Sequence, residues 1–405
     1  MNDRRISVLH AVTDSLSTVL MRGQLTYLRN IGYDPILLSS PGKEVDRIRM
    51  HEGLSVITVP MRREISMARD LRSLIGIWRL LGRTKPTICN SGTPKAGLLV
   101  GISAWLVRVP CRVYTLRGLR LETATGPKRI ILTLTERLAC GCAHRVICVS
   151  PSLRERAIAL GLLPRSKAVV LGAGSSNGVD PVRFVPTPER LALAEALREQ
   201  VGIRPDQQVV GFVGRFTKDK GVEELVAAFK LIQAKSPKAV LLLIGDYEEG
   251  DPISENIKNA IELDHGIRCV GFKAEIELYY LIMNVFVLPT HREGFPNAIL
   301  EAQAAGLPVV TTKATGAVDA IDDGVTGLLT PVGDSQELAE AILSLLHNPT
   351  KGRVMGLAGR DRVLKKFRNE IIWEELSRLY TEMLRERGYP IPSSPCVETM
   401  RCVQT

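Results

Sequence analysis

The sequence has no apolar run long enough to cross a lipid bilayer. Its longest apolar stretches, such as residues 96–107 (AGLLVGISAWLV), are shorter than the roughly 20 residues that a transmembrane helix needs. The first residues do not combine a charged segment with a following apolar one, so no signal peptide is expected. We therefore expect a chain that works in the cytoplasm.

Cysteine is also sparse, with eight residues scattered through strand-like runs and the tail. Cys140 and Cys142 are separated by one residue, which is too close for a zinc knuckle, and no Cys/His pair follows at ligand spacing. Reduced thiols in a cytosolic protein are the simpler interpretation. No metal and no cofactor are expected.

Acidic residues are few in the first part of the chain. Residues 1–185 contain 28 Lys and Arg against 12 Asp and Glu, whereas residues 186–405 contain 25 against 31. The first part therefore accounts for the net charge of +10, and this asymmetry indicates an anionic partner, either a membrane surface or nucleic acid. A basic surface can also serve solubility alone. No aromatic-rich or recognised nucleic-acid motif accompanies the charge, which disfavours nucleic acid.

Strand-like and helical segments alternate along the chain. Residues 6–12 (ISVLHAV) predict a buried first strand, and the alternation that follows indicates βαβ units and parallel sheets. It breaks in the Pro-rich and polar residues 185–208 and resumes at residues 209–214. We expect two doubly wound domains with a ligand-binding cleft at their strand C-termini. Their expected bounds are 1–185 and 186–369, followed by a helix at 370–388 and a tail at 389–405.

Two helices of the first domain are expected from apolar spacing. Leu20, Leu25 and Leu28 predict one helix that stops at Gly32. Residues 68–85 predict a second helix, with its arginines on a solvated face. Its expected core side comprises Leu71, Leu74, Ile75, Trp78 and Leu81.

A candidate phosphate-binding loop follows the first strand of the second domain, in residues 211–229 (GFVGRFTKDKGVEELVAAF). Gly214 permits a tight turn, Arg215 and Lys220 supply two cations, and a helix is expected to begin near Gly221. Backbone donors at a helix start, with Arg and Lys beside them, bind a phosphate chain. The loop is neither a P-loop nor a dinucleotide-binding glycine turn, and a surface charge cluster is the alternative.

Two carboxylates, Glu293 and Glu301, stand eight residues apart in THREGFPNAILEAQAAGLPVVTT. The Gly-Phe-Pro-Asn turn between them leads into a helix expected from about Asn297. Glu301 is placed to accept hydrogen bonds from a ribose diol, and Glu293 from the hydroxyls of a sugar beyond the phosphates. The pair would thus bracket a nucleotide-sugar. A helix-start acid favoured by the macrodipole beside an unrelated surface acid is the alternative.

These motifs together resemble those of retaining glycosyltransferases of family 4. The E-x7-E of Glu293 and Glu301 is similar to that family's donor-site motif, and Arg215 and Lys220 match its diphosphate-binding Arg and Lys. GAGSSNGVDPVRF (172–184) resembles the segment with which many members leave the N-terminal domain. TPKAGLLVGISAW and CVSPSLRERAIALG are similar to the bacterial capsule, O-antigen and exopolysaccharide subset. The resemblance covers about residues 6 to 385.

The resemblance implies a GT-B fold of the α/β class, with two Rossmann-like doubly wound parallel-sheet domains and an inter-domain cleft. The acceptor would bind the first domain and the nucleotide-sugar the second, and the last helix would cross back to the first. The implied reaction is a retaining, metal-independent transfer from a nucleotide diphosphate-sugar to a lipid-linked (polyprenyl diphosphate) glycan, and a UDP-sugar is the expected donor. The leaving phosphate would accept the proton, so the two-carboxylate hydrolase scheme does not apply.

The expected site residues fall into three groups. The catalytic group is Glu293, Arg215, Lys220 and Arg117. The donor-binding group is Glu301, Gly214, Phe295, Pro296, Asn297, Phe272 and Lys273. The acceptor-binding group is Lys95 and Arg117, because Lys95 stands at a helix start where it can bind phosphate. His291 is either a catalytic group or only a hydrogen-bonding loop residue.

The sequence departs from the family pattern at two places. Arg117, in VYTLRGLRLET, replaces a His found in many members, so a neutral imidazole is excluded and a permanent cation is present instead. The glycine pair common in the first loop is absent, which leaves Gly23 alone.

The basic excess of the first domain suggests a peripheral position on the inner face of a bacterial cell membrane. Each arginine near anionic headgroups contributes about 1 kcal/mol. The arginines expected to face such headgroups are Arg62, Arg63, Arg69, Arg72 and Arg79. Trp78 and Leu81 could enter the interface, although core packing is the alternative.

Two other functions remain open from the sequence. A UDP-sugar 2-epimerase shares the two-domain plan, and a non-catalytic sensor would keep the donor site without turnover.

Overall fold

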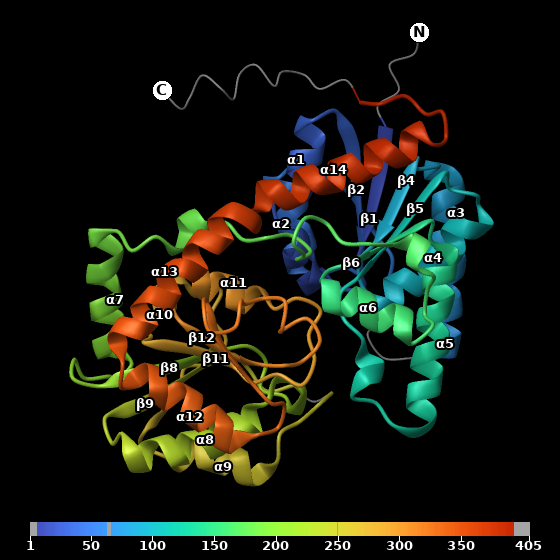
Figure 1. The fold of residues 1–405 in the computed structure, drawn as a ribbon. Helices are drawn as coiled ribbons and strands as arrows, with labels where there is room; N and C mark the ends of the chain where they lie inside the picture. The colour runs from blue at the N-terminus through green and yellow to red at the C-terminus, as the bar shows by residue number, and fades with distance from the viewer. Residues whose placement is uncertain (1–5, 63–65, 249, 393–405) are drawn as a thin grey trace. The chain divides into compact units, whose positions relative to one another are not determined.

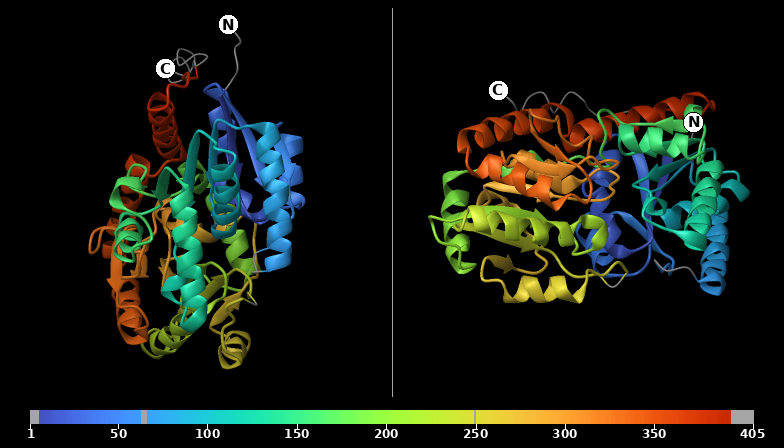
Figure 2. Two further views of the ribbon diagram at one scale, coloured as in Figure 1. Left: turned by 90° about the vertical axis from the view of Figure 1, so that its right-hand side faces the viewer. Right: turned by 60° about the horizontal axis from the view of Figure 1, so that its bottom comes forward.

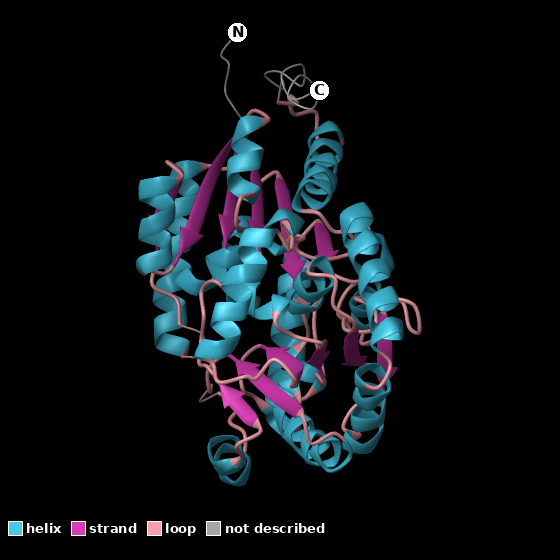
Figure 3. Ribbon diagram, turned by 90° about the vertical axis from the view of Figure 1, so that its left-hand side faces the viewer, coloured by secondary structure: helices cyan, strands magenta, loops and turns pink. Residues whose placement is uncertain are grey.

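The structure is a computed structural model that describes residues 6–62, 66–248 and 250–392. It divides into two compact units (Figure 1). Unit 1 comprises residues 1–177 and 369–405, and unit 2 comprises residues 178–368. Each unit has its own parallel sheet with helices on both faces, which confirms the expected α/β class (Figure 3).

Within the described residues, the sheet of unit 1 has seven strands in the order β3-β2-β1-β4-β5-β6-β7, and all neighbouring strands are parallel. The chain moves outward from β1 in one direction and then, from β4, in the other, which is the doubly wound arrangement. The strands are β1 (Ile6–Ala11), β2 (Tyr33–Ser39), β3 (Ser55–Thr58), β4 (Ile88–Ser91), β5 (Cys111–Leu116), β6 (Arg145–Cys148) and β7 (Ala168–Val169).

Helices cover both faces of this sheet. One core cluster joins β1, β4 and their neighbours to α3 and α4, and another joins the sheet to α1 and α14. The helices are α1 (Gln24–Asn30), α2 (Lys43–His51), α3 (Met67–Thr84), α4 (Pro94–Leu106), α5 (Gly126–Cys142), α6 (Pro151–Ala159) and α14 (Asn369–Arg385).

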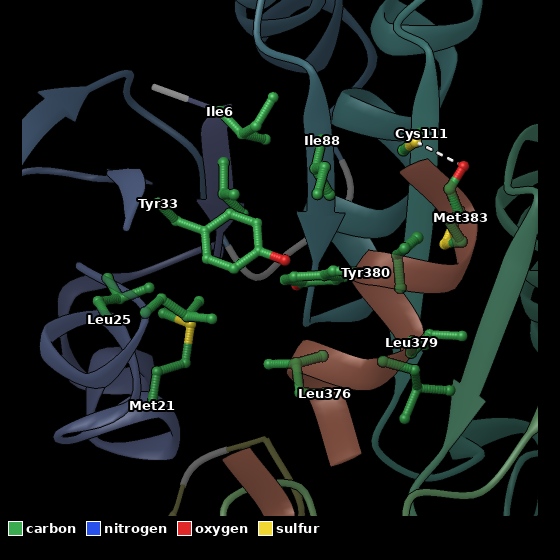
Figure 4. Close-up of a cluster of buried hydrophobic side chains, with 14 of the residues drawn as sticks. Ile6, Met21, Leu25, Tyr33, Ile88, Cys111, Leu376, Leu379, Tyr380 and Met383 are labelled. Atoms are coloured by element: carbon green, nitrogen blue, oxygen red, sulfur yellow. Dashed lines mark hydrogen bonds between the residues drawn. The ribbon is translucent and has the colours of Figure 1, made fainter. Parts of the chain in front are cut away.

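The last helix, α14, belongs to the core of unit 1 although 191 residues of unit 2 separate it from the preceding part. Figure 4 shows Tyr380 of α14 beside Tyr33 and Ile88, with the Tyr33 and Tyr380 ring centroids 6.1 Å apart. The Tyr380 hydroxyl accepts a hydrogen bond from Asn90 at 2.8 Å and lies 2.9 Å from Nε2 of His10. Burial, with the nearby charge of Arg117, lowers the pKa of His10 to about 3 and keeps it neutral. The helix is thus tied to β1 and β4 by apolar and polar contacts.

The part of unit 2 that the structure describes contains a six-stranded parallel sheet in the order β10-β9-β8-β11-β12-β13. Strands β9 and β11 are fully buried apolar runs, as parallel strands covered on both faces must be. The strands are β8 (Gln208–Val213), β9 (Ala239–Ile244), β10 (Ile267–Cys269), β11 (Val285–Leu288), β12 (Val309–Thr312) and β13 (Gly327–Thr330). The helices are α7 (Pro188–Gln200), α8 (Val222–Lys235), α9 (Glu255–Leu263), α10 (Glu277–Leu281), α11 (Asn297–Ala304), α12 (Ser335–Leu346) and α13 (Pro349–Lys366).

The boundary between the units lies after Asn177, whereas the sequence placed it after residue 185. Val179 pairs with Arg368, and Phe184 is buried with its ring 5.6 Å from that of Tyr280, so residues 178–185 are part of unit 2. The Pro-rich residues 185–208 predict the inter-domain segment, but the boundary lies before them because Phe184 makes a core contact in unit 2 that the local sequence does not reveal.

Two helices of unit 1 differ from the expectation. The single helix expected through Leu20 and Leu28 is a 3₁₀ helix (Ser15–Met21) followed by α1, because Gly23 adopts φ +78° between them. A Cβ at Gly23 would stand 2.7 Å from the Trp373 ring, so glycine is required there.

In α3 the expected core side is wrong for three residues. Ser73, Ile77 and Leu81 are buried against the sheet, whereas Leu71, Ile75 and Trp78 are exposed. The apolar stripe read from the sequence is wider than the face that the sheet covers. Leu81 is therefore core and not available to a membrane.

Three other sequence expectations concern membranes, thiols and metals. Among the described residues, no helix combines the length and apolar character that spanning a bilayer requires. Cys140 and Cys142 are buried free thiols, and burial raises the pKa of both. No group of three or more His, Cys, Asp or Glu side chains is gathered as a metal site within residues 6–62, 66–248 and 250–392.

Candidate functional site

The carboxyl edge of the unit 2 sheet brings together the loops after β8 and β11, which are adjacent strands. Gly221 allows this close approach: its φ is +71°, and a Cβ there would overlap the carbonyl oxygen of Pro289. Gly316, after β12, is packed in the same way on the carbonyl of Glu293, which lies 2.6 Å from the position of its Cβ. The loops that carry the expected donor residues are therefore in backbone contact.

Two ion pairs join these loops. Lys220 pairs with Glu293, and Asp219 pairs with Arg292. All four side chains are less than a fifth exposed. The structure therefore unites two residues that the sequence assigned to different parts of the donor, and it adds Asp219 and Arg292, which the sequence analysis did not single out.

His291 lies in the same array. Its Nε2 is 2.8 Å from Oε1 of Glu224 in the first turn of α8, and its backbone N–H donates to the carbonyl of Asp219 at 2.8 Å. The hydrogen bond to Glu224 raises the pKa of His291, and Asp219 and Asp251 add to the effect. His291 thus links the first turn of α8 to the Glu293 loop through its contact with Glu224.

Arg215 lies at the same edge but toward β9. Its side chain is more than half exposed, and its guanidinium pairs with Glu248, which follows β9. Glu248 belongs to no recognisable motif, so the sequence analysis did not identify it.

Gly214 has a different role from the expected tight turn. Its φ is not in the left-handed region, and its N–H continues the ladder by donating to Ile244 at 3.0 Å. The position that needs glycine is Gly245, with φ +147° and a Cβ that would overlap the Gly214 carbonyl. Position 245 needs glycine because the ends of β8 and β9 pack closely together there.

Glu301 projects from the second turn of α11 and is half-buried. Its Oε2 accepts a hydrogen bond at 2.8 Å from the hydroxyl of Tyr280, a fully buried residue of α10. A donated bond from a fixed phenol orients the carboxylate. The sequence analysis missed this contact of Tyr280 with Glu301, since α10 is short and distant in sequence.

The remaining residues expected to bind the donor lie in two places, the turn before α11 and the segment after β10. Phe295 is buried with its ring 5.3 Å from that of Phe367, Pro296 caps α11, and Asn297 is its first residue, as expected. Phe272 and Lys273, beyond β10, are exposed, and the Phe272 N–H donates to Asp246 at 3.1 Å. Phe295 is thus a core anchor for the turn, whereas Phe272 offers a free aromatic face.

In unit 1, Arg117 follows β5 at the carboxyl edge of the sheet. Its Nε donates to the carbonyl of Gly92 at 2.7 Å, and a Cβ on Gly92 would stand 3.0 Å from its Nη2. Burial lowers the pKa of Arg117 to about 10, so it is still a cation at neutral pH. The structure holds this charge over the end of β4.

Lys95, at the start of α4, is ion-paired with Asp70 of α3 at 2.8 Å. Its side chain is 11% exposed, so the charge expected to bind acceptor phosphate already has a carboxylate partner. Arg62, Arg69, Arg72 and Arg79 are exposed, and Arg63 lies outside the described residues.

Comparison with known proteins gives matches along most of the chain. The model of the "Glycosyl transferase 4-like domain" matches residues 18–174, and that of "Glycosyl transferases group 1" matches residues 194–362. The capsular polysaccharide biosynthesis glycosyltransferase CapM of Staphylococcus aureus is 40% identical over 379 residues, which cover 94% of this chain and 98% of that protein.

A second relative is the UDP-Gal:alpha-D-GlcNAc-diphosphoundecaprenol alpha-1,3-galactosyltransferase of Escherichia coli. It is 27% identical over 325 residues, or 80% of this chain and 82% of that protein. Among solved structures, Anabaena Alr3699/HepE in complex with UDP and glucose superposes with a TM-score of 0.78 at 20% identity, covering 93% of this chain and 100% of that one. At this identity the likeness concerns the fold.

Proposed function

Because the chain belongs to the group 1 glycosyltransferases, we propose that it transfers a sugar from a UDP-sugar to a lipid-linked glycan in the synthesis of a surface polysaccharide. Its fold is GT-B, in agreement with the resemblance seen in the sequence. The name of the S. aureus relative supports the polysaccharide, and the name of the E. coli relative supports the donor class and the diphosphate-lipid acceptor.

The proposed donor site rests on one observation, the set of ion pairs at the carboxyl edge of the unit 2 sheet. A nucleoside diphosphate-sugar carries negative charge at its centre and hydroxyls at both ends. Lys220 and Arg215 supply two cations, each now held by a carboxylate. When a diphosphate takes Lys220, Glu293 is released to accept hydrogen bonds from the sugar. Glu301, oriented by Tyr280, accepts from the ribose diol.

The proposed reaction retains the anomeric configuration. The bond between the anomeric carbon and the β-phosphate oxygen breaks as the acceptor hydroxyl oxygen bonds to the same carbon from the same face. The hydroxyl proton passes to the leaving phosphate oxygen, and UDP departs. Lys220 and Arg215 stabilise the charge that develops on the diphosphate, an effect commonly worth several kcal/mol. We propose that these cations make a divalent metal unnecessary.

On the acceptor side, we propose that Arg117 binds the diphosphate of the lipid-linked glycan. Its permanent charge, its fixed contact with Gly92 and its place at the carboxyl edge of unit 1 support this role. Lys95 would contribute only if its ion pair with Asp70 broke and the acceptor phosphate took the place of the carboxylate. Arg117→Gln should therefore raise the acceptor KM more than Lys95→Gln does.

The experiment is a screen of UDP-sugars with a lipid-diphosphate-sugar acceptor, read by mass spectrometry, with the product anomer assigned by NMR. Transfer with retention is expected, and chelator should leave the rate unchanged. Loss of activity with chelator and rescue by Mn²⁺ or Mg²⁺ would overturn metal independence, and an inverted product would overturn the stereochemistry.

Controls without acceptor test the other functions considered from the sequence. Slow release of UDP is expected. Formation of an epimer, or binding with no turnover under any condition, would contradict the transferase. Arg215→Ala and Lys220→Ala should each reduce transfer, and near-normal rates in both variants would place the donor site elsewhere.

A further inference from the structure

An exposed apolar stripe runs along α3. Met67, Leu71, Ile75 and Trp78 are between 39% and 87% exposed, and their spacing of four, four and three residues places them on one side of the helix. This side is distinct from the core face formed by residues 73, 77 and 81. A soluble helix normally carries polar residues outside its core face, so the second apolar side requires an explanation.

The next two helices continue this surface. Helix α4 has one charged residue, Lys95 at its start, and ends with Trp105 and Leu106 at least half exposed. In α5, exposed apolar side chains recur on the side opposite the buried residues Glu136, Ala139 and Cys140. The exposed apolar residues of α5 are Ile130, Ile131, Leu134 and Leu138.

The three helices form one layer of unit 1. Ser103 of α4 donates to the carbonyl of Leu74 at 3.4 Å, which places α4 beside the apolar side of α3. A Cβ at Gly101 would stand 3.6 Å from Cys142 of α5, so α4 also packs closely on α5. The left view of Figure 2 looks onto this layer. An exposed apolar surface that extends over three helices marks an interaction site.

The surface has a basic rim. Arg72, Arg79 and Arg83 are exposed on the flank of α3 beside the apolar stripe, and Lys128, Arg129 and Arg137 are exposed on α5. The three helices contain two carboxylates: Asp70 is paired with Lys95, and Glu136 is buried and accepts from Tyr114 at 2.6 Å. Apolar side chains bordered by cations, without free acids, fit the interfacial region of a bilayer that contains anionic lipids.

We propose that the outer face of α3, α4 and α5 docks the protein on such a bilayer, with the apolar side chains in the interface and the rim on the headgroups. Trp78 and Trp105 have the amphipathic rings that prefer this depth. A second copy of the chain fits less well, because pairing this face with itself brings two basic rims together. The inference rests on the proposed function, in which the acceptor's lipid anchor lies in the membrane. The Asp70–Lys95 pair places the start of α3 beside the edge that carries Arg117.

The test uses the full chain and two kinds of vesicle, phosphatidylcholine alone and phosphatidylcholine with phosphatidylglycerol, in a sedimentation assay. Binding to the anionic vesicles is expected, with a blue shift of tryptophan fluorescence. The apolar variant Leu71→Gln/Trp105→Gln/Leu134→Gln should lower the partition coefficient at least tenfold. The rim variant Arg72→Gln/Arg79→Gln/Arg83→Gln should lower it on anionic vesicles. Because apolar contacts do not depend on ionic strength, salt should weaken binding of the native chain only in part.

The matched control is Val354→Gln/Leu357→Gln, which replaces two exposed apolar residues of α13 in unit 2 and should leave vesicle binding unchanged. Equal binding by the apolar variant and this control would overturn the proposal. A concentration-dependent dimer in sedimentation velocity that the apolar variant abolishes would also overturn it and assign the face to a second copy. UDP affinity and transfer to a water-soluble acceptor, measured in parallel, report on the proposed function independently of vesicle binding.

Discussion

Lys220 and Glu293 form an ion pair that links the ends of the adjacent strands β8 and β11. The two side chains are 18% and 13% exposed, so each is partly desolvated and depends on the other for charge compensation. Under the proposed function, the diphosphate competes with Glu293 for Lys220.

We expect Glu293→Gln to bind UDP more tightly and to turn over more slowly. The substitution leaves Lys220 without its carboxylate until a phosphate arrives, so the dissociation constant of UDP should fall several-fold, where tenfold corresponds to about 1.4 kcal/mol. The rate constant should fall because the sugar loses its acceptor group. Calorimetry and initial rates measure the two effects, with the exposed Glu337→Gln as control. Weaker UDP binding in Glu293→Gln would contradict the competition.

Tyr280→Phe should weaken UDP binding through Glu301. The variant removes the hydroxyl that donates to Glu301 at 2.8 Å and keeps the buried ring. Losing one hydrogen bond to a charged group costs about 1.5–3 kcal/mol. Part of this free energy holds Glu301 in its binding orientation, so its loss should raise the dissociation constant of UDP with little change in kcat. The neighbouring Tyr279, also buried on α10, supplies the control Tyr279→Phe. Equal UDP affinities in the two variants would show that Tyr280 serves packing alone.

The Glu224–His291 pair should stabilise unit 2 in a pH-dependent manner. The folded protein holds the His291 proton more tightly than the unfolded chain does, because the pKa of His291 is raised. The stabilisation is therefore complete below the unfolded pKa of about 6.5 and is lost as the pH rises through the folded pKa. Thermal unfolding across a pH series should show native protein and Glu224→Gln converging at alkaline pH. The exposed His265→Gln is the control, and a constant difference between native and variant at every pH would argue against the pair.

Tyr380→Phe should destabilise unit 1. The hydroxyl bonds Asn90 and lies 2.9 Å from His10, both buried, and its removal leaves these groups without that partner. The expected loss is about 1–3 kcal/mol in the free energy of unfolding, measured by chemical denaturation. Tyr389→Phe, at an exposed position after α14, should have no effect. A Tyr380 variant as stable as this control would mean that the apolar contacts of α14 suffice.

Much of the fold follows from local patterns in the sequence. Apolar runs separated by helices predict two doubly wound parallel sheets, since a parallel strand buried on both faces must be apolar and needs a crossover helix. The starts of α8 and α11 follow from Gly221 and from the Pro-Asn pair, whose backbone preferences are local. Glu293, Glu301, Arg215 and Lys220 are predicted to bind the donor from short local motifs and their resemblance to the family 4 pattern, and this assignment stays a prediction.

Other features depend on contacts between segments far apart in sequence. Parallel strands and neighbouring helices bring their ends together, and three interactions result. These are the ion pair of Lys220 with Glu293, the hydrogen bond from Tyr280 to Glu301 and the ion pair of Asp70 with Lys95. Spacing along one chain carries no information about such partners.

The exposed side of α3 is a second feature that the sequence pattern alone does not predict. Periodicity groups Leu71, Leu74, Ile75, Trp78 and Leu81 on one apolar side, but only the sheet and α4 decide which of them are covered. The two parallel sheets, and the positions of the acids and cations expected to bind the donor, could be predicted from local sequence patterns. The pairing of those charges and the exposure of the apolar residues could not, because both depend on what packs against each side chain from elsewhere in the chain.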